Sequence, residues 1–239
     1  MTLTPEALPT VDPHAATFGA GGSEPYARAL RRDGRLQLVR DDASAGGAAP
    51  VDHDDDAFDV ARWSADADAA DLSTLEGASS VLDVGCGPAR MVRAAVDRGQ
   101  RVLGVDVSPV AVELARAAGL PVAAGSVFEP VPHEGDWDVV LLLDGNIGIG
   151  GDPAALLGRC AEVMAADGSV VVETAVDASV DVVYLARVLD DLGSTSDAFP
   201  WAEVGASALP AHAARAGLGV AQAWSVDGRR FCRLARTTR

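Results

Sequence analysis

The sequence predicts an α/β protein built on a doubly wound, Rossmann-like sheet that is mostly parallel. Apolar, strand-like runs alternate with helical patterns over about residues 79–173, which is typical of consecutive βαβ units. Residues 137–144 are almost entirely apolar, as expected of a strand that is covered on both faces. Residues 81–90 have the pattern of a strand, a glycine turn and a helix. In a parallel sheet such a turn lies at the carboxyl end of a strand, where ligands bind.

The elements of this sheet follow one another in a regular order. Strands are predicted at 80–84, 101–106, 120–124, 137–144 and 168–173, and helices at 89–98, 108–119, 153–164 and 206–216. Ser108 followed by Pro109 is a typical helix start, and Gly99 and Gly217 are typical of helix ends. Residues 219–226 and 230–235, joined by an Asp-Gly turn, predict an antiparallel C-terminal hairpin.

Two further regions flank this pattern. Residues 1–72 are interpreted as a lead-in and cap segment, with a short helix near Tyr26, a strand or turn at 36–39 and an acidic helix start at 51–63. Residues 73–239 form the main domain. Within it, residues 175–204 are an insertion that we expect to cover a substrate, with a helix at 180–192 and a loop at 199–201.

The composition excludes several classes of function. The formal net charge is −16, which disfavours a nucleic-acid substrate or an anionic membrane surface as a partner. All 19 basic residues are arginine, so chemistry that needs lysine is excluded. The 3 cysteines have no paired spacing, which argues against a disulfide framework and a metal site. Without a signal peptide or a membrane-spanning run, we expect a soluble cytoplasmic protein.

Polar and glycine residues recur at the ends of successive predicted strands. Gly85-Cys86-Gly87 offers close-packed backbone, and Asp106, about 20 residues further on, is placed to accept ribose hydroxyls. Ser126 and Val127 offer a side chain and a backbone N–H to an adenine edge, and Asp144 ends the next strand. This ordered recurrence predicts a nucleoside-type cofactor.

The choice of cofactor depends on the glycine turn. A dinucleotide site favours G-x-G-x-x-G, but Arg90 stands at the sixth position, where a glycine allows close packing of helix and strand. The sequence also lacks a Tyr-x-x-x-Lys pair. Asp106 fits either kind of cofactor and does not discriminate between them.

Residues 79–173 resemble the class I S-adenosylmethionine-dependent methyltransferases. Residues 81–90 are similar to motif I of that family, with Asp83 as the leading acid, Gly85 and Gly87 as the first two glycines and Ala89 in place of the third. Residues 105–108, which include Asp106 and Val107, resemble the second motif, in which the acid binds the ribose. Residues 125–128 resemble the adenine-side motif, where Ser126 replaces the usual Asp, and residues 138–146 resemble motif IV.

This resemblance implies S-adenosyl-L-methionine as cofactor and transfer of its methyl group to a small molecule. The cofactor-binding residues are then Asp83, Gly85, Cys86, Gly87, Asp106, Val107, Ser126, Val127 and Asp144. Asp144 is also the candidate general base, although it or Asn146 would equally bind the methionine amino group. His53 is a second candidate base. Asp144-Gly145-Asn146 differs from the Asn/Asp-Pro-Pro-aromatic motif of enzymes that methylate nucleic-acid bases.

The flanking regions supply candidates for the rest of the site. Arg62 with Trp63 is the one basic–aromatic pair in an acidic segment, and we expect Arg62 to reach the cofactor carboxylate or an acidic acceptor. Tyr184, Phe199 and Trp201 are candidates for an acceptor pocket or for core packing. Two other functions stay open: a nicotinamide-dependent oxidoreductase and a non-catalytic nucleoside-binding protein. O- and N-methylation are both compatible with these residues, and the oligomeric state is not predicted.

Overall fold

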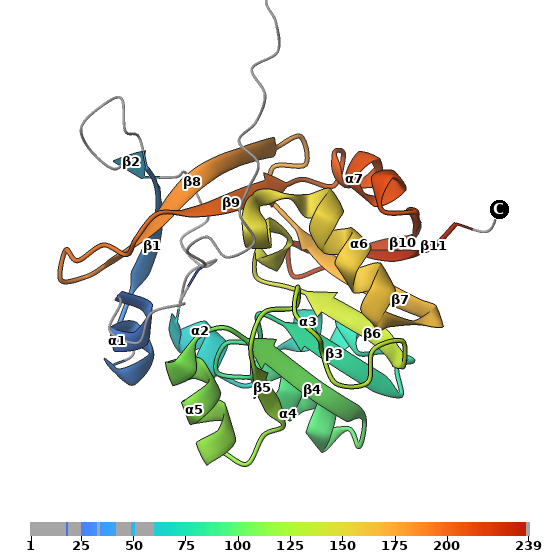
Figure 1. Cartoon of the computed structure of the whole chain (residues 1–239), viewed down its shortest axis with the longest axis horizontal. Coiled ribbons are helices and arrows are strands. Elements are labelled where there is room, and N and C mark those ends of the chain that lie inside the picture. Colours follow the sequence, from blue (N-terminus) through green and yellow to red (C-terminus); the bar gives the residue numbers. More distant parts are fainter. Residues whose placement is uncertain (1–17, 19–24, 33, 42–48, 51–59, 238–239) are drawn as a thin grey trace, which may run out of the picture.

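The main sheet contains seven strands in the order β10-β11-β7-β6-β3-β4-β5 (Figure 1), within the residues that the computed structural model describes: 18, 25–32, 34–41, 49–50 and 60–237. Strands β3 to β7 are paired in parallel, whereas β11 is antiparallel to both β7 and β10. This confirms the predicted fold and its antiparallel C-terminal hairpin. The bounds are β3 Ser80–Val84, β4 Arg101–Asp106, β5 Val122–Ala124, β6 Trp137–Leu142, β7 Met164–Thr174, β10 Leu218–Val226 and β11 Arg229–Arg236.

Helices cover both faces of this sheet. One face, which includes Leu82 and Leu142, packs against α6 (Pro153–Val163) and α7 (Leu209–Arg215). The other face, which includes Val81 and Leu141, packs against α3 (Ala69–Thr74) and α4 (Arg90–Asp97). Alternate residues of one strand therefore enter two different cores, which explains why the central strands are apolar throughout. Helix α5 (Pro109–Ala117) begins as predicted, because Ser108 Oγ accepts the N–H of Ala111.

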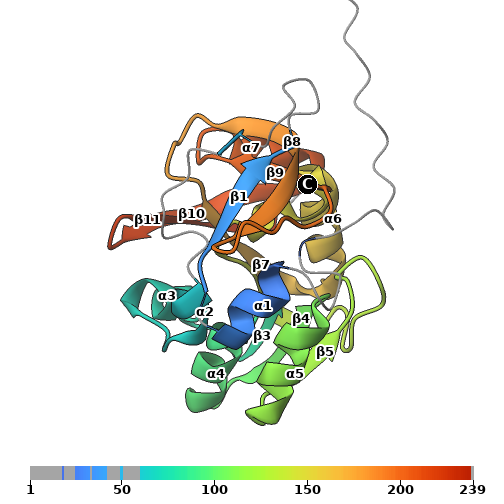
Figure 2. The same ribbon diagram turned by 90° about the vertical axis from the view of Figure 1, so that its left-hand side faces the viewer.

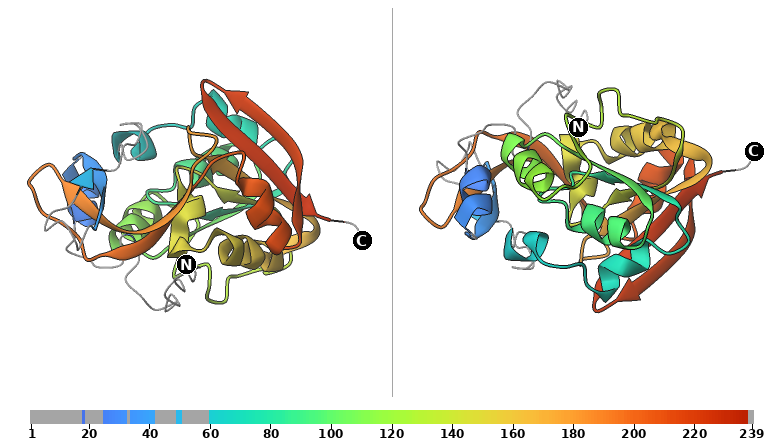
Figure 3. Two further views of the ribbon diagram at one scale, coloured as in Figure 1. Left: turned by 90° about the horizontal axis from the view of Figure 1, so that it is seen from above. Right: turned by 90° about the horizontal axis from the view of Figure 1, so that it is seen from below.

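A second sheet joins the two flanking regions. It has four antiparallel strands in the order β2-β1-β8-β9, with bounds β1 Leu36–Arg40, β2 Ala49–Pro50, β8 Asp181–Asp190 and β9 Phe199–Val204 (Figure 2). Helix α1 (Pro25–Arg32) packs on this sheet and is fixed to it by an ion pair of Arg28 with Asp190 at 2.8 Å. We call this sheet with α1 the cap. Figure 3 shows α1 at one end of the molecule and the β10–β11 hairpin at the other.

Some predictions for the flanking regions were wrong. The helix predicted at 180–192 is strand β8, and the loop predicted at 199–201 is the start of strand β9. The apolar spacing of the first segment fits both a helix and a strand, and pairing with β1 decides for the strand. Helix α3 was not predicted, and the glycine loop at 145–151 contains a 3-10 helix, η2 (Asn146–Gly151).

The acidic segment of the predicted cap is described only in part. Helix α2 (Val60–Ser64) agrees with the predicted helix start, whereas residues 51–59, with His53, lie outside the described residues, as does His14. The strand or turn predicted at 36–39 is strand β1. None of the helices in the described ranges is long and apolar enough to cross a membrane.

The cap rests on η2 through a contact that requires glycine. A Cβ on Gly148 would lie 2.3 Å from the carbonyl oxygen of Ala202 and 2.7 Å from the ring of Trp201. Both partners belong to β9, so the absence of a side chain lets this strand approach η2. The glycine-rich loop therefore positions the cap over the carboxyl end of the main sheet.

We expect Gly148→Ala to lower the free energy of unfolding by about 1–3 kcal/mol, because the added methyl group clashes with the backbone of β9. Gly158→Ala is the matched control. Gly158 lies within α6, and no atom of the described part of the chain outside this helix comes within 4 Å of its Cβ position, so alanine there should stabilise the protein by about 0.5–1 kcal/mol. Urea unfolding of both variants measures the two effects. Equal effects in the two variants would contradict the proposed contact.

Candidate functional site

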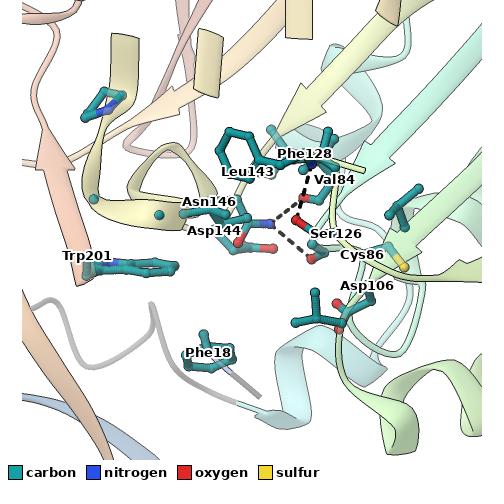
Figure 4. Close-up of a pocket in the computed structure, with 18 of the residues that line it drawn as sticks. Phe18, Val84, Cys86, Asp106, Ser126, Phe128, Leu143, Asp144, Asn146 and Trp201 are labelled. Atoms are coloured by element: carbon teal, nitrogen blue, oxygen red, sulfur yellow. Dashed lines mark hydrogen bonds between the residues drawn. The ribbon is translucent and has the colours of Figure 1, made fainter. Parts of the chain in front are cut away.

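A cavity of about 970 Å³ lies between the carboxyl ends of the main-sheet strands, η2 and the cap (Figure 4). Its size is at the upper end of the range for small-molecule sites. The cavity brings together nine of the ten residues that the sequence analysis proposes for the cofactor: Asp83, Gly85, Cys86, Gly87, Asp106, Val107, Ser126, Val127 and Asp144. Arg62 is not among its lining residues.

The side chain of Asn146 packs against the glycine turn after β3 and binds its backbone. Gly85 has φ +69° and Gly87 has φ +52°, conformations that glycine adopts without strain. The Asn146 Nδ2 donates to the carbonyl oxygens of Val84 at 2.8 Å and Gly85 at 3.0 Å. A Cβ on Gly85 would lie 2.8 Å from the same Nδ2. Glycine at position 85 therefore lets Asn146 pack against the turn, and Gly85 and Gly87 both line the cavity.

The Asp106 carboxylate is oriented by backbone donors on both sides. Its Oδ2 accepts the N–H of Gly87 at 2.7 Å, and its Oδ1 accepts the N–H of Ser108 at 2.8 Å. Burial raises the pKa of Asp106, and these two hydrogen bonds oppose part of that shift. Each carboxylate oxygen has a further lone pair, so this group can still accept hydrogen bonds from a pair of hydroxyls.

The loop after β5 forms the neighbouring wall. Ser126 Oγ accepts the N–H of Phe128 at 3.2 Å, and Val127 is buried. The Phe128 ring lies 3.3 Å from the position of a Cβ on Gly150, so this loop contacts η2. In Figure 4, Phe18 and Trp201 lie across the cavity from Ser126 and Cys86.

Asp144 lies at the base of the cavity in a strained, well-anchored conformation. Its φ of +52° is uncommon for a residue other than glycine. Its N–H donates to Glu173 Oε2 at 2.8 Å, and its Oδ2 accepts from Arg90 at 2.7 Å. Its Oδ1 lies 3.6 Å from Arg229 and 3.7 Å from Arg62. Three guanidinium groups therefore surround this carboxylate.

Arg90 and Arg229 connect Asp144 to a wider set of buried ion pairs. Arg90 also contacts Asp71 at 3.2 Å, and Arg229 contacts Asp71 and both oxygens of Glu173 at 2.7 Å. Burial alone would lower the pKa of Arg229, but the carboxylates of Glu173 and Asp71 raise it well above its usual value. We call this set, Arg90, Arg229, Asp71, Asp144 and Glu173, the buried ion network.

Sequence reasoning missed most of this network. Arg90 was noted only as a departure from a dinucleotide motif, and Asp71, Glu173 and Arg229 were not singled out. One local signal for Asp71 exists, because Asp68 and Asp71 form a capping box at the start of α3. Arg62 lies behind the cavity, 3.9 Å from Asp68 and 3.7 Å from Asp144.

The aromatic side chains predicted for the acceptor pocket are divided. Trp201 and Tyr184 line the cavity, whereas Phe199 packs behind Trp201 with ring centroids 5.9 Å apart. Phe18 and Tyr26, which the sequence did not single out for this pocket, line it as well. Phe18 lies 4.8 Å from Tyr26 and 5.9 Å from Trp201 between ring centroids.

His212 also lines the cavity, but its ring nitrogens are engaged or enclosed. Nε2 lies 2.8 Å from Asp181 Oδ1, and Nδ1 is buried with no hydrogen-bond partner among the described residues. His133 packs edge-on against Trp137, away from the cavity lining.

Residues 81–168 match the sequence profile of a methyltransferase domain. The fold is similar to that of an S-adenosylmethionine-dependent methyltransferase from Bacteroides fragilis, crystallised with S-adenosyl-L-homocysteine. The sequences are 18% identical, the similarity covers 90% of this chain and 95% of that one, and the TM-score is 0.69.

Two further solved structures resemble smaller parts of the chain. A 1,6-didemethyltoxoflavin N1-methyltransferase from Burkholderia thailandensis is 19% identical over 71% of this chain and 77% of its own, with a TM-score of 0.52. A sugar N-methyltransferase from a Streptoalloteichus species is 19% identical over 73% and 88%, with a TM-score of 0.54.

Residues 81–168 thus match a methyltransferase domain, and the chain shares the fold of a solved methyltransferase. The cavity lies at the carboxyl ends of the strands of this domain. Its lining fits a nucleoside-type cofactor, because Gly85, Gly87 and the anchored Asp106 carboxylate face one cavity.

We expect Arg90→Ala to lower the free energy of unfolding by about 3–5 kcal/mol, because it leaves the buried carboxylate of Asp71 with one arginine fewer. Arg93→Ala, on the exposed face of the same helix, should change it by less than about 0.5 kcal/mol. Urea unfolding of both variants tests the difference. A loss below about 1 kcal/mol in the Arg90 variant would show that the network is not what fixes this region.

Asp83 gives a pH-dependent prediction. Burial and the nearby charge of Asp144 raise its pKa to about 7, and Arg90 opposes the shift. The folded state therefore keeps a proton that the unfolded state loses near pH 4, so ionisation of Asp83 lowers stability as the pH rises to about 7. The free energy of unfolding of Asp83→Asn minus that of the parent protein should therefore increase by about 2 kcal/mol from pH 5.5 to pH 8. Urea unfolding at both pH values, with the exposed Asp97→Asn as control, measures this gain. A stability difference that is the same at both pH values would refute the shifted pKa.

Proposed function

We propose that this enzyme transfers the methyl group of S-adenosylmethionine to an oxygen or nitrogen of a small-molecule acceptor by direct displacement. The observation that supports this function is the continuity of one cavity from the strand ends of the main sheet to the aromatic residues of the cap. One end of the cavity suits a nucleoside, and the other end suits an apolar organic molecule. We further propose that residues 1–72 and the insertion at 175–204 together cover the acceptor, as part of the cap.

The cofactor is assigned to the strand ends. We assign the ribose hydroxyls to the Asp106 carboxylate, the adenine edge to Ser126 and Val127, and the methionine part to the backbone of Gly85 to Gly87 beside Asp83 and Asp144. Val107 and Cys86 line the same surface. S-adenosylmethionine supplies an electrophilic methyl group on sulfur, so the protein contributes mainly alignment of the acceptor with that group.

The role of Asp144 follows from its surroundings. Both oxygens of this carboxylate already face guanidinium groups: Oδ2 accepts from Arg90 at 2.7 Å, and Oδ1 lies 3.6 Å from Arg229 and 3.7 Å from Arg62. We therefore propose that Asp144, fixed by Arg90 and with Arg62 behind it, orients the methionine end of the cofactor. Solvent then takes the proton that the acceptor loses.

The acceptor is proposed to be a small molecule. The cap closes over the cavity, and the net charge of −16 disfavours the phosphate backbone of a nucleic acid. The compounds named for two structurally similar proteins, 1,6-didemethyltoxoflavin and a sugar, are also small molecules. A nicotinamide-dependent oxidoreductase is the competing function, and titration of S-adenosylmethionine and NADH in separate calorimetry experiments separates the two.

Asp106→Ala tests the cofactor assignment. We expect it to weaken binding of S-adenosylhomocysteine by about 1–3 kcal/mol, because charge-assisted hydrogen bonds to the ribose are lost. Asp97→Ala, an exposed acid on α4, is the control and should leave the affinity unchanged. Isothermal titration calorimetry measures both. Unchanged affinity in the Asp106 variant would show that the ribose binds elsewhere, and NADH binding in place of S-adenosylhomocysteine would overturn the function.

A further inference from the structure

We propose that the acceptor is an amine, a primary or secondary amino group on an apolar body that enters the cavity as a cation. This inference rests on the proposed function, since it concerns the acceptor end of the same cavity. Two independent features of that end point to it: the aromatic side chains that surround it and the sign of the charges along its walls.

The aromatic feature is a cluster of four rings that all line the cavity: Phe18, Tyr26, Trp63 and Trp201. Tyr26 and Trp63 have ring centroids 6.0 Å apart, and Phe18 lies 6.4 Å from Trp63. The cluster comes from three parts of the chain, because Trp63 belongs to α2, Tyr26 to α1 and Trp201 to β9. We call it the aromatic wall. Aromatic faces attract organic cations through their quadrupoles, and tryptophan does so most strongly.

Tyr26 keeps this wall uncharged. Its ring is buried, and burial together with the charge of Asp106 raises the pKa of its hydroxyl well above the usual value. The hydroxyl lies near the glycine turn, 3.2 Å from the position of a Cβ on Gly87. Tyr26 therefore connects the aromatic wall to the cofactor end of the cavity as a neutral hydrogen-bonding group.

The charges along the walls have a net negative sign. Asp83, Asp106, Asp144 and Arg90 belong to the cofactor end of the cavity. Among the other described lining residues, the carboxylates Asp152 and Asp181 stand against one arginine, Arg215. A cavity with low-dielectric walls and one sign of charge concentrates ligands of the opposite sign. A cationic acceptor is therefore favoured over an anionic one.

The same charges distinguish nitrogen from oxygen as the methylated atom. A hydroxyl becomes a strong nucleophile only when it loses its proton, and a negative environment disfavours the oxyanion that results. The same environment also favours an ammonium over its amine, but the amine is a strong nucleophile in its neutral form and never has to carry a negative charge. Its ammonium loses one proton to solvent, and the nitrogen lone pair then forms a C–N bond while the C–S bond breaks with its electron pair left on sulfur. The positive charge passes from sulfur to nitrogen. The acids and the aromatic wall therefore stabilise the ammonium product, as they stabilise the ammonium form in which the acceptor enters.

Three probes with one carbon skeleton test the inference: 4-phenylbutylammonium, 4-phenylbutan-1-ol and 4-phenylbutanoate. Each is titrated by calorimetry into protein saturated with S-adenosylhomocysteine, which prevents turnover. We expect the ammonium to bind at least about tenfold more tightly than the alcohol, and the carboxylate to bind more weakly than both. A stronger alcohol or carboxylate, or no binding of the ammonium, would overturn the amine assignment.

Two variants locate the cation on the aromatic wall. Trp63→Leu and Trp201→Leu should each reduce the ammonium-to-alcohol preference to about threefold or less, as expected when one aromatic face is lost. Trp224→Leu is the matched control, since Trp224 stacks on Phe231 outside the cavity lining and should leave the preference unchanged. Trp63→Leu is the more informative variant if Trp201→Leu lowers the melting temperature. An unchanged preference in Trp63→Leu would refute the role of the wall.

Titration of S-adenosylhomocysteine alone, before any probe is added, separates this inference from the proposed function. If S-adenosylhomocysteine binds but the ammonium shows no preference, the methyltransferase assignment stands and the amine assignment fails. If S-adenosylhomocysteine itself does not bind, the proposed function fails as well.

Discussion

The buried pairing of Arg90 and Arg229 with shared carboxylates is the interaction on which the functional site depends. Asp71 is fully buried and contacts both arginines, so neither guanidinium can be removed without leaving charge in a medium of low dielectric. Through these contacts α3, α4, the end of β6, β7 and β11 meet at one point. Asp144 keeps its positive φ because Glu173 and Arg90 bind its backbone and side chain.

The network also explains how a ligand cavity can carry so many acids. Asp71, Asp144 and Glu173 are paired with arginine, whereas burial raises the pKa values of Asp83 and Asp106. At the base of the cavity, Asp144 is thus held by arginine side chains and Asp106 by backbone N–H groups. Such preorganisation matters for a displacement reaction, in which alignment supplies much of the rate.

The cap gives the second half of the site and is assembled from two distant parts of the chain. Strand β1 precedes the main sheet, and β8 and β9 follow its last parallel strand, yet they form one sheet. Its attachment to η2 depends on Gly148, where close backbone approach replaces side-chain packing. The end of the cavity that we assign to the nucleoside thus belongs to the main sheet, and two of the four rings of the aromatic wall, Tyr26 and Trp201, belong to the cap.

The sequence by itself determined the main sheet, its hairpin and the nine strand-end residues of the cavity, because strand and helix periods, glycine turns and caps are local properties. It did not determine the cap strands, where the spacing at 180–192 suits a helix as well as a strand until β1 pairs with it. Nor did it reveal why Arg90 stands in the glycine motif, since its partners Asp71 and Asp144 are remote in the chain. The strand conformation of β8 and the position of Arg90 both depend on pairing between distant segments, which only the tertiary structure brings together.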